Sequence, residues 1–222
     1  MAHLEFTTAQ PDVQRRAIHL FYERRGKRMV DLCLAVLLLP VLAPIIALLW
    51  IITRCDGQPG LFAHTRIGRN GTPFRCWKIR TMVADAEAHL ARHIANNPQA
   101  AHEWSRAHKL TDDPRVTRLG RILRRTSLDE LPQIWNVLCG DMSLVGPRPV
   151  TECELSRYGA HRSIYLNLRP GVTGLWQIKG RSNGCYEERL GMDRSYAATL
   201  GLYSDAALIL KTALVPFRPT GR

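Results

Sequence analysis

The chain has 222 residues, of which 45% are hydrophobic, and its 31 lysines and arginines outnumber 19 aspartates and glutamates to give a formal net charge of +12. This length suffices for one domain with a real core, and the charge favours phosphate groups in a nucleic acid, an anionic lipid or a phosphorylated substrate. The six cysteines include no CxxC pair, which argues against zinc and disulfide frameworks and favours a reducing compartment.

Residues 1–26 are a polar lead into a basic amphipathic stretch, in which Ile18, Leu20, Phe21 and Tyr22 stand beside arginines. A segment of this kind suits the boundary between water and lipid, where apolar side chains enter the membrane and basic ones face anionic headgroups. We therefore predict an N-terminal interfacial segment over residues 1–26.

An uncharged apolar run extends from Leu32 to Thr53 and is long enough to cross a membrane. A cleaved signal peptide fits poorly, because the run exceeds the usual apolar core of such peptides and no A-x-A site follows closely. In a straight span, the basic residues before the run would hold the N-terminus in the cytoplasm. Residues 54–222, with the phosphate-seeking charge and most of the cysteines, would then lie outside.

Pro40 and Pro44 offer a different course for the membrane segment, residues 27–54. Each proline lacks an N–H and disrupts the helix one turn back, so the two together can bend it until it enters and leaves by the same face. The freed carbonyls then need donors from neighbouring groups, because lipid has none. The residues alone leave a re-entrant helix and a kinked but complete span as equal alternatives, with residues 55–222 forming the remaining domain.

Turn residues predict the secondary structure of residues 61–109. Residues 61–82 read as a β-hairpin whose turn is Asn70-Gly71. Residues 83–109 read as helical with a break at Asn96-Asn97-Pro98.

A strongly basic helix is expected near Arg115–Arg125, and a second amphipathic helix follows it. Their patterns suit a protein that lies on anionic lipid, although an ordinary stripe facing the core explains each helix as well. The apolar residues are Val116, Leu119, Ile122 and Leu123 in the first helix and Leu131, Ile134, Trp135 and Leu138 in the second.

Asp129 and Glu130 form the adjacent carboxylate pair that follows a dense run of arginines. A structural explanation is a capping box between Ser127 and Glu130. Pro132 argues against it, because with Ser127 as N-cap the proline would fall at a position that must donate a helix hydrogen bond. With Asp129 as N-cap no bond is lost, so we expect Asp129 at a helix start, near free N–H groups and the positive end of the helix dipole.

A carboxylate at such a position, beside arginines, is expected to stay ionised. An ionised aspartate can attack phosphorus and form an acyl phosphate. The neighbouring Glu130 can help to hold Mg²⁺, which prefers oxygen ligands together with substrate phosphate. The residues alone leave simple helix capping as a rival to this chemistry.

Arginines also lie in stiff loops that are rich in glycine and proline. Arg148 is held in Gly146-Pro147-Arg148-Pro149, Arg169 precedes Pro170-Gly171, and Arg181 follows Gly180. Rigid loops suit bidentate recognition of phosphate by guanidinium groups, although a surface ion pair would explain any one of these arginines.

Many strings along the chain, from about Lys27 to about Thr212, resemble the monotopic polyprenyl-phosphate phosphoglycosyl transferases, the bacterial sugar transferase family. The resemblance is to the short form, without extra N-terminal membrane helices. The matching strings are Lys27-Arg28 with Asp31, Arg66-Ile67-Gly68, Lys78-Ile79-Arg80-Thr81-Met82, Asp113-Pro114-Arg115-Val116-Thr117, the long block from Ser127 to Pro149, Arg169-Pro170-Gly171-Val172-Thr173-Gly174, Gln177 and Gly180-Arg181.

This resemblance implies a mainly helical α+β fold with a re-entrant membrane helix broken at proline, interfacial amphipathic helices and a small β-hairpin. It implies that Asp129 attacks the β-phosphate of a UDP-sugar and releases UMP, with Glu130 as its partner and Mg²⁺ at the pair. Undecaprenyl phosphate then attacks the covalent phosphosugar, in the first membrane step of exopolysaccharide or glycoconjugate synthesis. The residues it assigns to binding of substrate or phosphate are Arg80, Arg124, Arg148 and Arg181.

The resemblance further implies a place on the cytoplasmic face of the bacterial inner membrane, in contact with anionic lipids. One departure is Ala43-Pro44, where the family often has Ser-Pro at the helix break. Within the family, several strings look most like the rhizobial exopolysaccharide-initiating enzymes, which transfer galactose-1-phosphate or glucose-1-phosphate, and galactose is narrowly favoured. A homodimer is a further expectation, which no single residue supports.

Two other classes compete with the transferase. A nucleic-acid-binding protein would explain the charge, but the apolar run and the lack of a recognition motif count against it, so no nucleic-acid partner is expected. A polybasic membrane scaffold would explain the charge and the apolar run, but it would have no use for a carboxylate pair.

Overall fold

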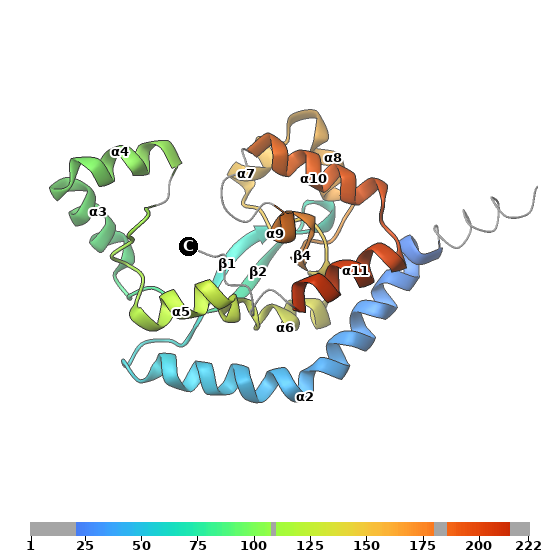
Figure 1. Ribbon diagram of the computed structural model, residues 1–222, viewed down its shortest axis with the longest axis horizontal. Helices are drawn as coiled ribbons and strands as arrows, with labels where there is room; N and C mark the ends of the chain where they lie inside the picture. Colours follow the sequence, from blue (N-terminus) through green and yellow to red (C-terminus); the bar gives the residue numbers. More distant parts are fainter. Residues whose placement is uncertain (1–20, 108–109, 180–185, 214–222) are drawn as a thin grey trace, which may run out of the picture.

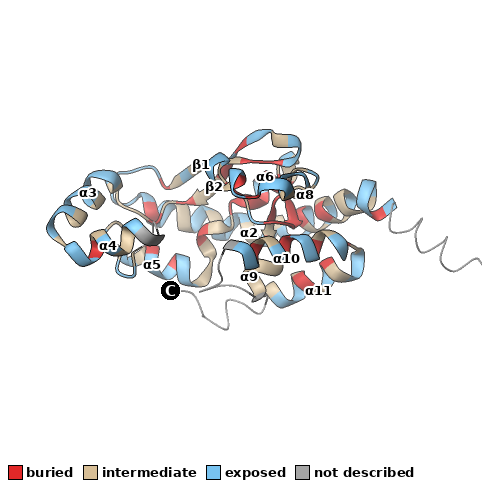
Figure 2. Ribbon diagram, turned by 90° about the horizontal axis from the view of Figure 1, so that it is seen from above, coloured by how far each residue is buried: buried red, intermediate tan, exposed pale blue. Residues whose placement is uncertain are grey.

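The computed structural model describes residues 21–107, 110–179 and 186–213. Over these ranges the chain is mainly helical with a small β-hairpin, as the sequence predicts. Figure 2 shows that buried residues concentrate in the middle of the molecule, whereas α3 and α4 at one end are largely exposed. The predicted N-terminal interfacial segment lies mostly outside the described residues.

The longest element is α2 (Lys27–Arg54), which continues from a π-helical turn at Tyr22–Gly26 and contains Pro40 and Pro44. Figure 1 shows it as one uninterrupted helix that changes direction partway along the lower edge of the molecule. A proline removes one hydrogen bond and presses on the preceding turn, which explains a bend without a break in the chain. The re-entrant course through a membrane stays a prediction.

Little of α2 is covered by the rest of the protein. Among the described residues, Tyr22–Arg54 is the one helix that is long and apolar enough to cross a membrane. Only Asp31, Ala35 and Thr53 of α2 are buried. Large apolar side chains on it, such as Leu37 and Val41, are 72% and 61% exposed. An apolar surface of this extent calls for a lipid or protein partner.

The first turns of α2 are anchored firmly to the rest of the chain. Arg28 donates from Nη1 to the carbonyl of Val137 and from Nη2 to that of Leu138, at 2.6 and 3.1 Å, in the last turn of α6 (Gln133–Cys139). The Val137 carbonyl also accepts from the N–H of Gly140, at 3.1 Å, so the arginine adds a donor to carbonyls at the end of the helix. Asp31 accepts a hydrogen bond from the backbone N–H of Leu144, at 3.0 Å.

The predicted hairpin is confirmed. Strands β1 (Leu61–Ile67) and β2 (Pro73–Ile79) pair antiparallel, with Leu61 opposite Ile79 and Ile67 opposite Pro73. The connecting loop places Asn70 and Gly71 at φ values of 60° and 80°. These two residue types tolerate the left-handed region best, which is why Asn-Gly marks the turn.

The helical region after the hairpin divides as predicted, into α3 (Ala86–Asn96) and α4 (Pro98–Ala107). The basic helix is shorter than predicted, because α5 spans Arg118–Thr126 and not Arg115–Arg125. Thr117 is its N-cap and accepts a hydrogen bond from the N–H of Gly120, while Val116 is paired with Met82 in an isolated bridge. The Thr117 cap thus starts the helix one turn later than its apolar pattern suggests.

The C-terminal part contains elements that the sequence did not predict. Strands β3 (Ser143–Val145) and β4 (Gly171–Thr173) form a second, parallel pair. The described C-terminal part also contains five α-helices: α7 (Glu152–Ser156), α8 (Arg162–Leu166), α9 (Leu175–Lys179), α10 (Tyr186–Ala198) and α11 (Leu202–Ala213).

The main core joins the first half of α2 to β2, α6, β3 and the last two helices. Its polar centre is Asp205 on α11, which is 2% exposed. The Asp205 carboxylate accepts hydrogen bonds from the hydroxyls of Tyr22 and Tyr196, at 2.7 and 2.9 Å, and pairs with the Lys27 ammonium at 2.6 Å. This network fixes the C-terminal helix to the start of α2.

We expect Asp205→Asn to destabilise the fold by about 3–5 kcal/mol, because Lys27 would keep a nearly buried charge without its counter-ion. The unfolding midpoint should fall by on the order of 10 °C, measured by tryptophan fluorescence in one detergent. The matched control is Glu152→Gln, which breaks an exposed 3.0 Å pair with Arg162 and should cost no more than about 0.5 kcal/mol. Equal effects of the two substitutions would contradict the proposed role of the network.

Candidate active site

The Asp129–Glu130 pair lies in a short 3-10 turn, Leu128–Glu130, between α5 and α6. Ser127 adopts a left-handed conformation with φ of 59° and reverses the chain at the end of α5. No side-chain hydrogen bond from Ser127 caps the turn, so the capping-box explanation fails. The predicted N-cap position of Asp129 is also wrong: Pro132 is the N-cap of α6, and the proline therefore stands before the helix, where it costs no bond.

Asp129 is 7% exposed, and its environment differs from the predicted one. Burial first, and then the charge of Glu130, raise its pKa to about 6, against the opposing charges of Lys78 and Arg124. Desolvation thus outweighs the nearby cations and makes Asp129 less acidic than an ordinary aspartate. A carboxyl with a pKa near 6 is still mostly ionised at neutral pH.

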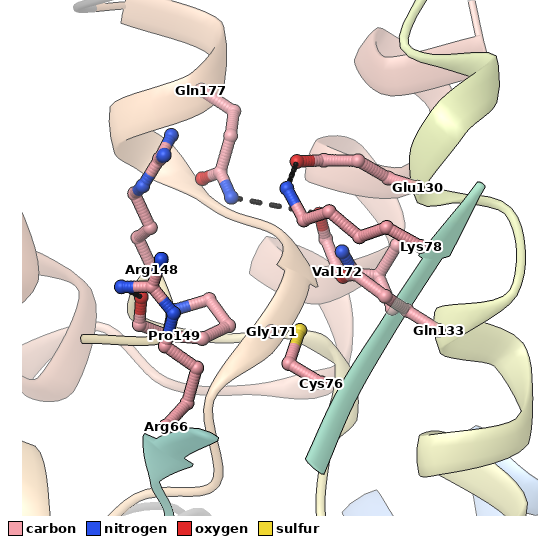
Figure 3. Close-up of a pocket in the computed structure, with 10 residues that line it drawn as sticks. All are labelled: Arg66, Cys76, Lys78, Glu130, Gln133, Arg148, Pro149, Gly171, Val172 and Gln177. Carbon is pink, nitrogen blue, oxygen red and sulfur yellow. Dashed lines mark hydrogen bonds and ion pairs between the residues drawn. The ribbon is translucent and has the colours of Figure 1, made fainter. Parts of the chain in front are cut away.

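Glu130 faces Lys78, which projects from β2. The Lys78 ammonium lies 2.6 Å from Glu130 Oε1, and both side chains are a little over one quarter exposed. Figure 3 shows this pair on one side of an open pocket, with Arg66 and Arg148 on the other side. The lining of the pocket also includes Cys76, Gln133, Pro149, Gly171, Val172 and Gln177.

Two of the predicted arginines come close to the carboxylate pair from separate elements. Arg124 on α5 donates to the Thr81 hydroxyl at 2.9 Å, and burial lowers its pKa although Asp129 and Asp113 favour the charged form. Arg148 follows β3 and lines the pocket. Part of Arg148 is exposed to solvent. Desolvation by the surrounding protein atoms nevertheless lowers its pKa, and the charge of Glu130 raises it.

Of the other two predicted arginines, only Arg80 lies in the described part of the chain, and it lies away from the pair. Arg80 donates to both carboxylate oxygens of Asp56, at 2.6 and 2.7 Å, and to the carbonyl of Thr53 at the end of α2. The structure thus uses Arg80 to hold the C-terminal end of α2, and its role in phosphate binding stays a prediction. Arg181 lies outside the described residues.

Several pocket residues were not identified from the sequence as site residues. Lys78 and Arg66 stand within strings that match the family, so those strings were an available signal for them. Gln133 and Cys76 carry no local pattern that would mark them. They reach the pocket only because α6 packs on β2.

The donors at the pair suit Mg²⁺. Within the described part of the chain no group of three or more His, Cys, Asp or Glu side chains could hold a metal ion by itself. Glu130 lines the open pocket and Asp129 is its neighbour in the chain, and Mg²⁺ can use such a carboxylate pair when substrate phosphates and water complete its shell. Asp129 and Glu130 are the side chains that would hold it.

We predict that Asp129→Asn stabilises the protein above about pH 6. Because the pKa of Asp129 is higher in the folded than in the unfolded chain, its protonated form favours folding. This contribution to the free energy of unfolding is complete below the ordinary pKa of 3.8 and is lost as the pH rises through about 6. The loss is at most about 3 kcal/mol, so the variant should gain several degrees in its unfolding midpoint at pH 7.5 and nothing near pH 4.

The measurement is thermal unfolding from pH 4 to pH 8 in one detergent. The control is Asp112→Asn, the same change at an exposed position, where no gain that grows with pH is expected. A variant that is less stable than the parent at pH 7.5 would show that burial does not disfavour the Asp129 charge.

The chain is similar in sequence to several known proteins. A family model described as bacterial sugar transferase matches residues 22–219. An undecaprenyl-phosphate galactose phosphotransferase of Salmonella typhimurium is 44% identical over 195 residues, which cover 88% of this chain and 41% of that protein. The exopolysaccharide production protein ExoY of Sinorhizobium fredii is 44% identical over 188 residues, which cover 84% of this chain and 83% of that protein.

A UDP-glucose:undecaprenyl-phosphate glucose-1-phosphate transferase of Caulobacter vibrioides is 37% identical over 195 residues, covering 84% of this chain and 67% of that protein. The chain spans about two fifths of the length of the Salmonella relative and of similar long relatives from Erwinia amylovora and Haemophilus influenzae. The family model and the ExoY protein, in contrast, match along most of the chain. The protein belongs to the bacterial sugar transferase family.

Proposed function

We propose that this protein transfers a hexose-1-phosphate from a UDP-sugar to undecaprenyl phosphate and releases UMP. The observation that carries the proposal is the carboxylate pair itself: Asp129 is buried, ionisable near neutral pH and beside Glu130, and Lys78 and Arg124 lie close enough to influence its charge. The names of the relatives support both the acceptor and the reaction class.

In the proposed first step, the Asp129 carboxylate attacks the β-phosphorus of the UDP-sugar. A bond forms between Asp129 oxygen and phosphorus, and the bond from that phosphorus to the bridging oxygen breaks, so that UMP departs with the electron pair. In the second step, an oxygen of undecaprenyl phosphate attacks the same phosphorus and displaces the carboxylate. The products are the sugar diphosphate of undecaprenol and regenerated Asp129, so the atoms balance.

The basic side chains have separate tasks in this scheme. Arg124 lies on the Asp129 side of the pair, whereas Arg148 lies in the pocket near Glu130. Guanidinium groups so placed can bind phosphate oxygens and stabilise charge that builds up as UMP departs. Mg²⁺, when bound at Asp129 and Glu130, would neutralise part of the diphosphate charge.

The proposed donor sugar is galactose, with glucose as the alternative. Relatives named for galactose transfer and for glucose-1-phosphate transfer are both similar to this chain. The proposed site of action is the cytoplasmic face of the bacterial inner membrane, where the bent α2 enters and leaves by the same side. This places the whole of residues 55–222 beside cytoplasmic UDP-sugars.

We expect purified protein with undecaprenyl phosphate and Mg²⁺ to release UMP from one member of a panel of UDP-sugars. Asp129→Asn should lower the rate by at least about 10³-fold, because an amide cannot form the acyl phosphate. The exposed substitution Asp112→Asn should leave the rate unchanged. The proposal fails if no UDP-sugar yields UMP, and the nucleophile is wrong if Asp129→Asn retains the parent rate.

The topology of α2 can be tested by cysteine labelling in a background without the native cysteines. Glu23→Cys and Gln58→Cys place one thiol before and one after α2. If the helix is re-entrant, a reagent that reaches only the periplasm should label neither position in intact cells, and both should react after lysis.

The prolines provide the matched comparison. With Pro40→Ala and Pro44→Ala together, the helix should straighten into a span, and Gln58→Cys should become accessible from the periplasm while Glu23→Cys stays protected. Periplasmic labelling of Gln58→Cys in the proline-containing chain would show that α2 already crosses the membrane.

A further inference from the structure

The pocket has a basic wall organised around one acid. Arg66, from the end of β1, donates from Nη1 to Glu154 Oε2 at 2.9 Å and to the carbonyl of Pro149 at 3.4 Å. Arg189, from α10, lies 3.9 Å from the other oxygen of Glu154. The charges of Arg66, Arg189 and Glu154 all influence the pKa of Arg148. Two guanidinium groups from two elements therefore lie 2.9 and 3.9 Å from a single carboxylate, and Arg148 lines the same pocket.

Glu154 is itself held rigidly. It is the third residue of α7, where it forms a capping box with Thr151: the Thr151 hydroxyl accepts from the Glu154 N–H, and Glu154 Oε2 accepts from the Thr151 N–H at 2.8 Å. Partial burial would raise the pKa of Glu154, but the Thr151 hydrogen bond and the charges of Arg66 and Arg189 lower it below its usual range. The carboxylate is thus fixed in place and ionised at neutral pH.

The backbone of Arg66 is fixed to the loop that carries Arg148. The N–H of Ile67 donates to the carbonyl of Val150 at 2.9 Å. The buried Tyr165 hydroxyl donates to the carbonyl of Ile67 at 2.6 Å and accepts from the N–H of Val150 at 3.3 Å. These bonds close the end of β1 onto the Arg148 loop, so the two arginines start from neighbouring points.

Two adjacent guanidinium groups repel each other, and a long side chain gives up rotamer freedom to stay in one place. The Glu154 charge offsets both costs for Arg66. Among the described residues, both hydrogen bonds of Arg66 run through Nη1, and a guanidinium has five N–H donors. Figure 3 shows the Arg66 guanidinium beside the Arg148 side chain, on the same wall of the pocket.

We propose that Glu154 is a positioning residue, which holds Arg66 beside Arg148 so that the two arginines together bind one phosphate group. The inference rests on the proposed function and extends it. The ligand is a phosphate monoester or one phosphate of a diphosphate, and it can come from the nucleotide donor or from the lipid acceptor.

The test uses Glu154→Gln in the full chain. The glutamine oxygen can still accept the Thr151 hydrogen bond, so the capping box is kept, while the charge that holds Arg66 is lost. The matched control is Glu152→Gln, on the same helix but in an exposed pair with Arg162. Unfolding midpoints within a few degrees of the parent show that both variants are folded.

Two equilibrium probes, UMP and a water-soluble short-chain prenyl phosphate, distinguish the two sources of phosphate without turnover. We expect Glu154→Gln to weaken binding of one of them by about tenfold, equivalent to loss of one charge-assisted hydrogen bond. Weaker UMP binding assigns the arginines to the donor, and weaker prenyl phosphate binding assigns them to the acceptor. In turnover, KM for that substrate alone should rise, with kcat within about threefold of the parent.

A positioning role also predicts that the effects of substituting Glu154 and Arg66 are not additive. Arg66→Gln should weaken the same probe, and the double variant Arg66→Gln with Glu154→Gln should be no weaker than Arg66→Gln alone, because Glu154 acts through Arg66. The inference is overturned if the two effects add, or if Glu154→Gln binds both probes as tightly as Glu152→Gln does. If Glu154→Gln does not fold, Arg66→Gln still decides: unchanged binding of both probes overturns the inference.

The two proposals can fail separately. A parent chain that binds UMP or prenyl phosphate but releases no UMP from any donor refutes the transfer reaction and leaves the arginine site intact. A parent chain that turns over donor, with Glu154→Gln equal to Glu152→Gln in binding and in KM, refutes the positioning role alone.

Discussion

Two adjacent carboxylates can both stay charged inside a protein only if positive groups lie close to them. Asp129 is 7% exposed, and burial and Glu130 both raise its pKa, while Lys78 and Arg124 lower it. Lys78 comes from the hairpin, Arg124 from α5 and Arg148 from the loop after β3. The pair therefore needs three separately formed parts of the chain to assemble around it, and the site is a property of the whole fold and not of the short 3-10 turn that carries it.

Elements that lie around the carboxylate pair also hold α2 near both of its ends. Near its start, Arg28 binds the last carbonyls of α6, a helix that begins three residues after Glu130, and Asp31 binds the N–H of Leu144 in β3. Near its end, Arg80, which directly follows β2, binds Asp56 and the Thr53 carbonyl. The uncovered apolar middle of α2 thus has a fixed position relative to the carboxylate pair. This arrangement gives Arg80 a clear structural task, which the sequence did not suggest.

The features that could be predicted from the sequence are those that local chemistry determines. Asn70-Gly71 specifies its turn, Asn97-Pro98 ends α3, and Pro40 and Pro44 bend α2 without help from distant residues. The pairing of β3 with β4 could not be predicted, because three-residue strands are too short to show an alternating pattern. The two strands also depend on a close approach of Gly146 and Gly171, where a Cβ on Gly171 would lie 2.1 Å from the Gly146 nitrogen. The raised pKa of Asp129 could not be predicted either. The sequence shows the neighbouring arginines, whereas the burial of Asp129 arises only in the tertiary fold.

That raised pKa bears directly on the proposed chemistry. The carboxylate must first attack phosphorus and later leave it, and a more basic oxygen attacks better but is harder to displace. With a pKa of about 6, Asp129 is roughly nine tenths ionised at pH 7, and it is more basic than an ordinary aspartate. A stronger influence of the Lys78 or Arg124 charge would make it a weaker nucleophile, and deeper burial would leave it protonated. The balance between desolvation and these two cations would therefore let one side chain serve in both proposed steps.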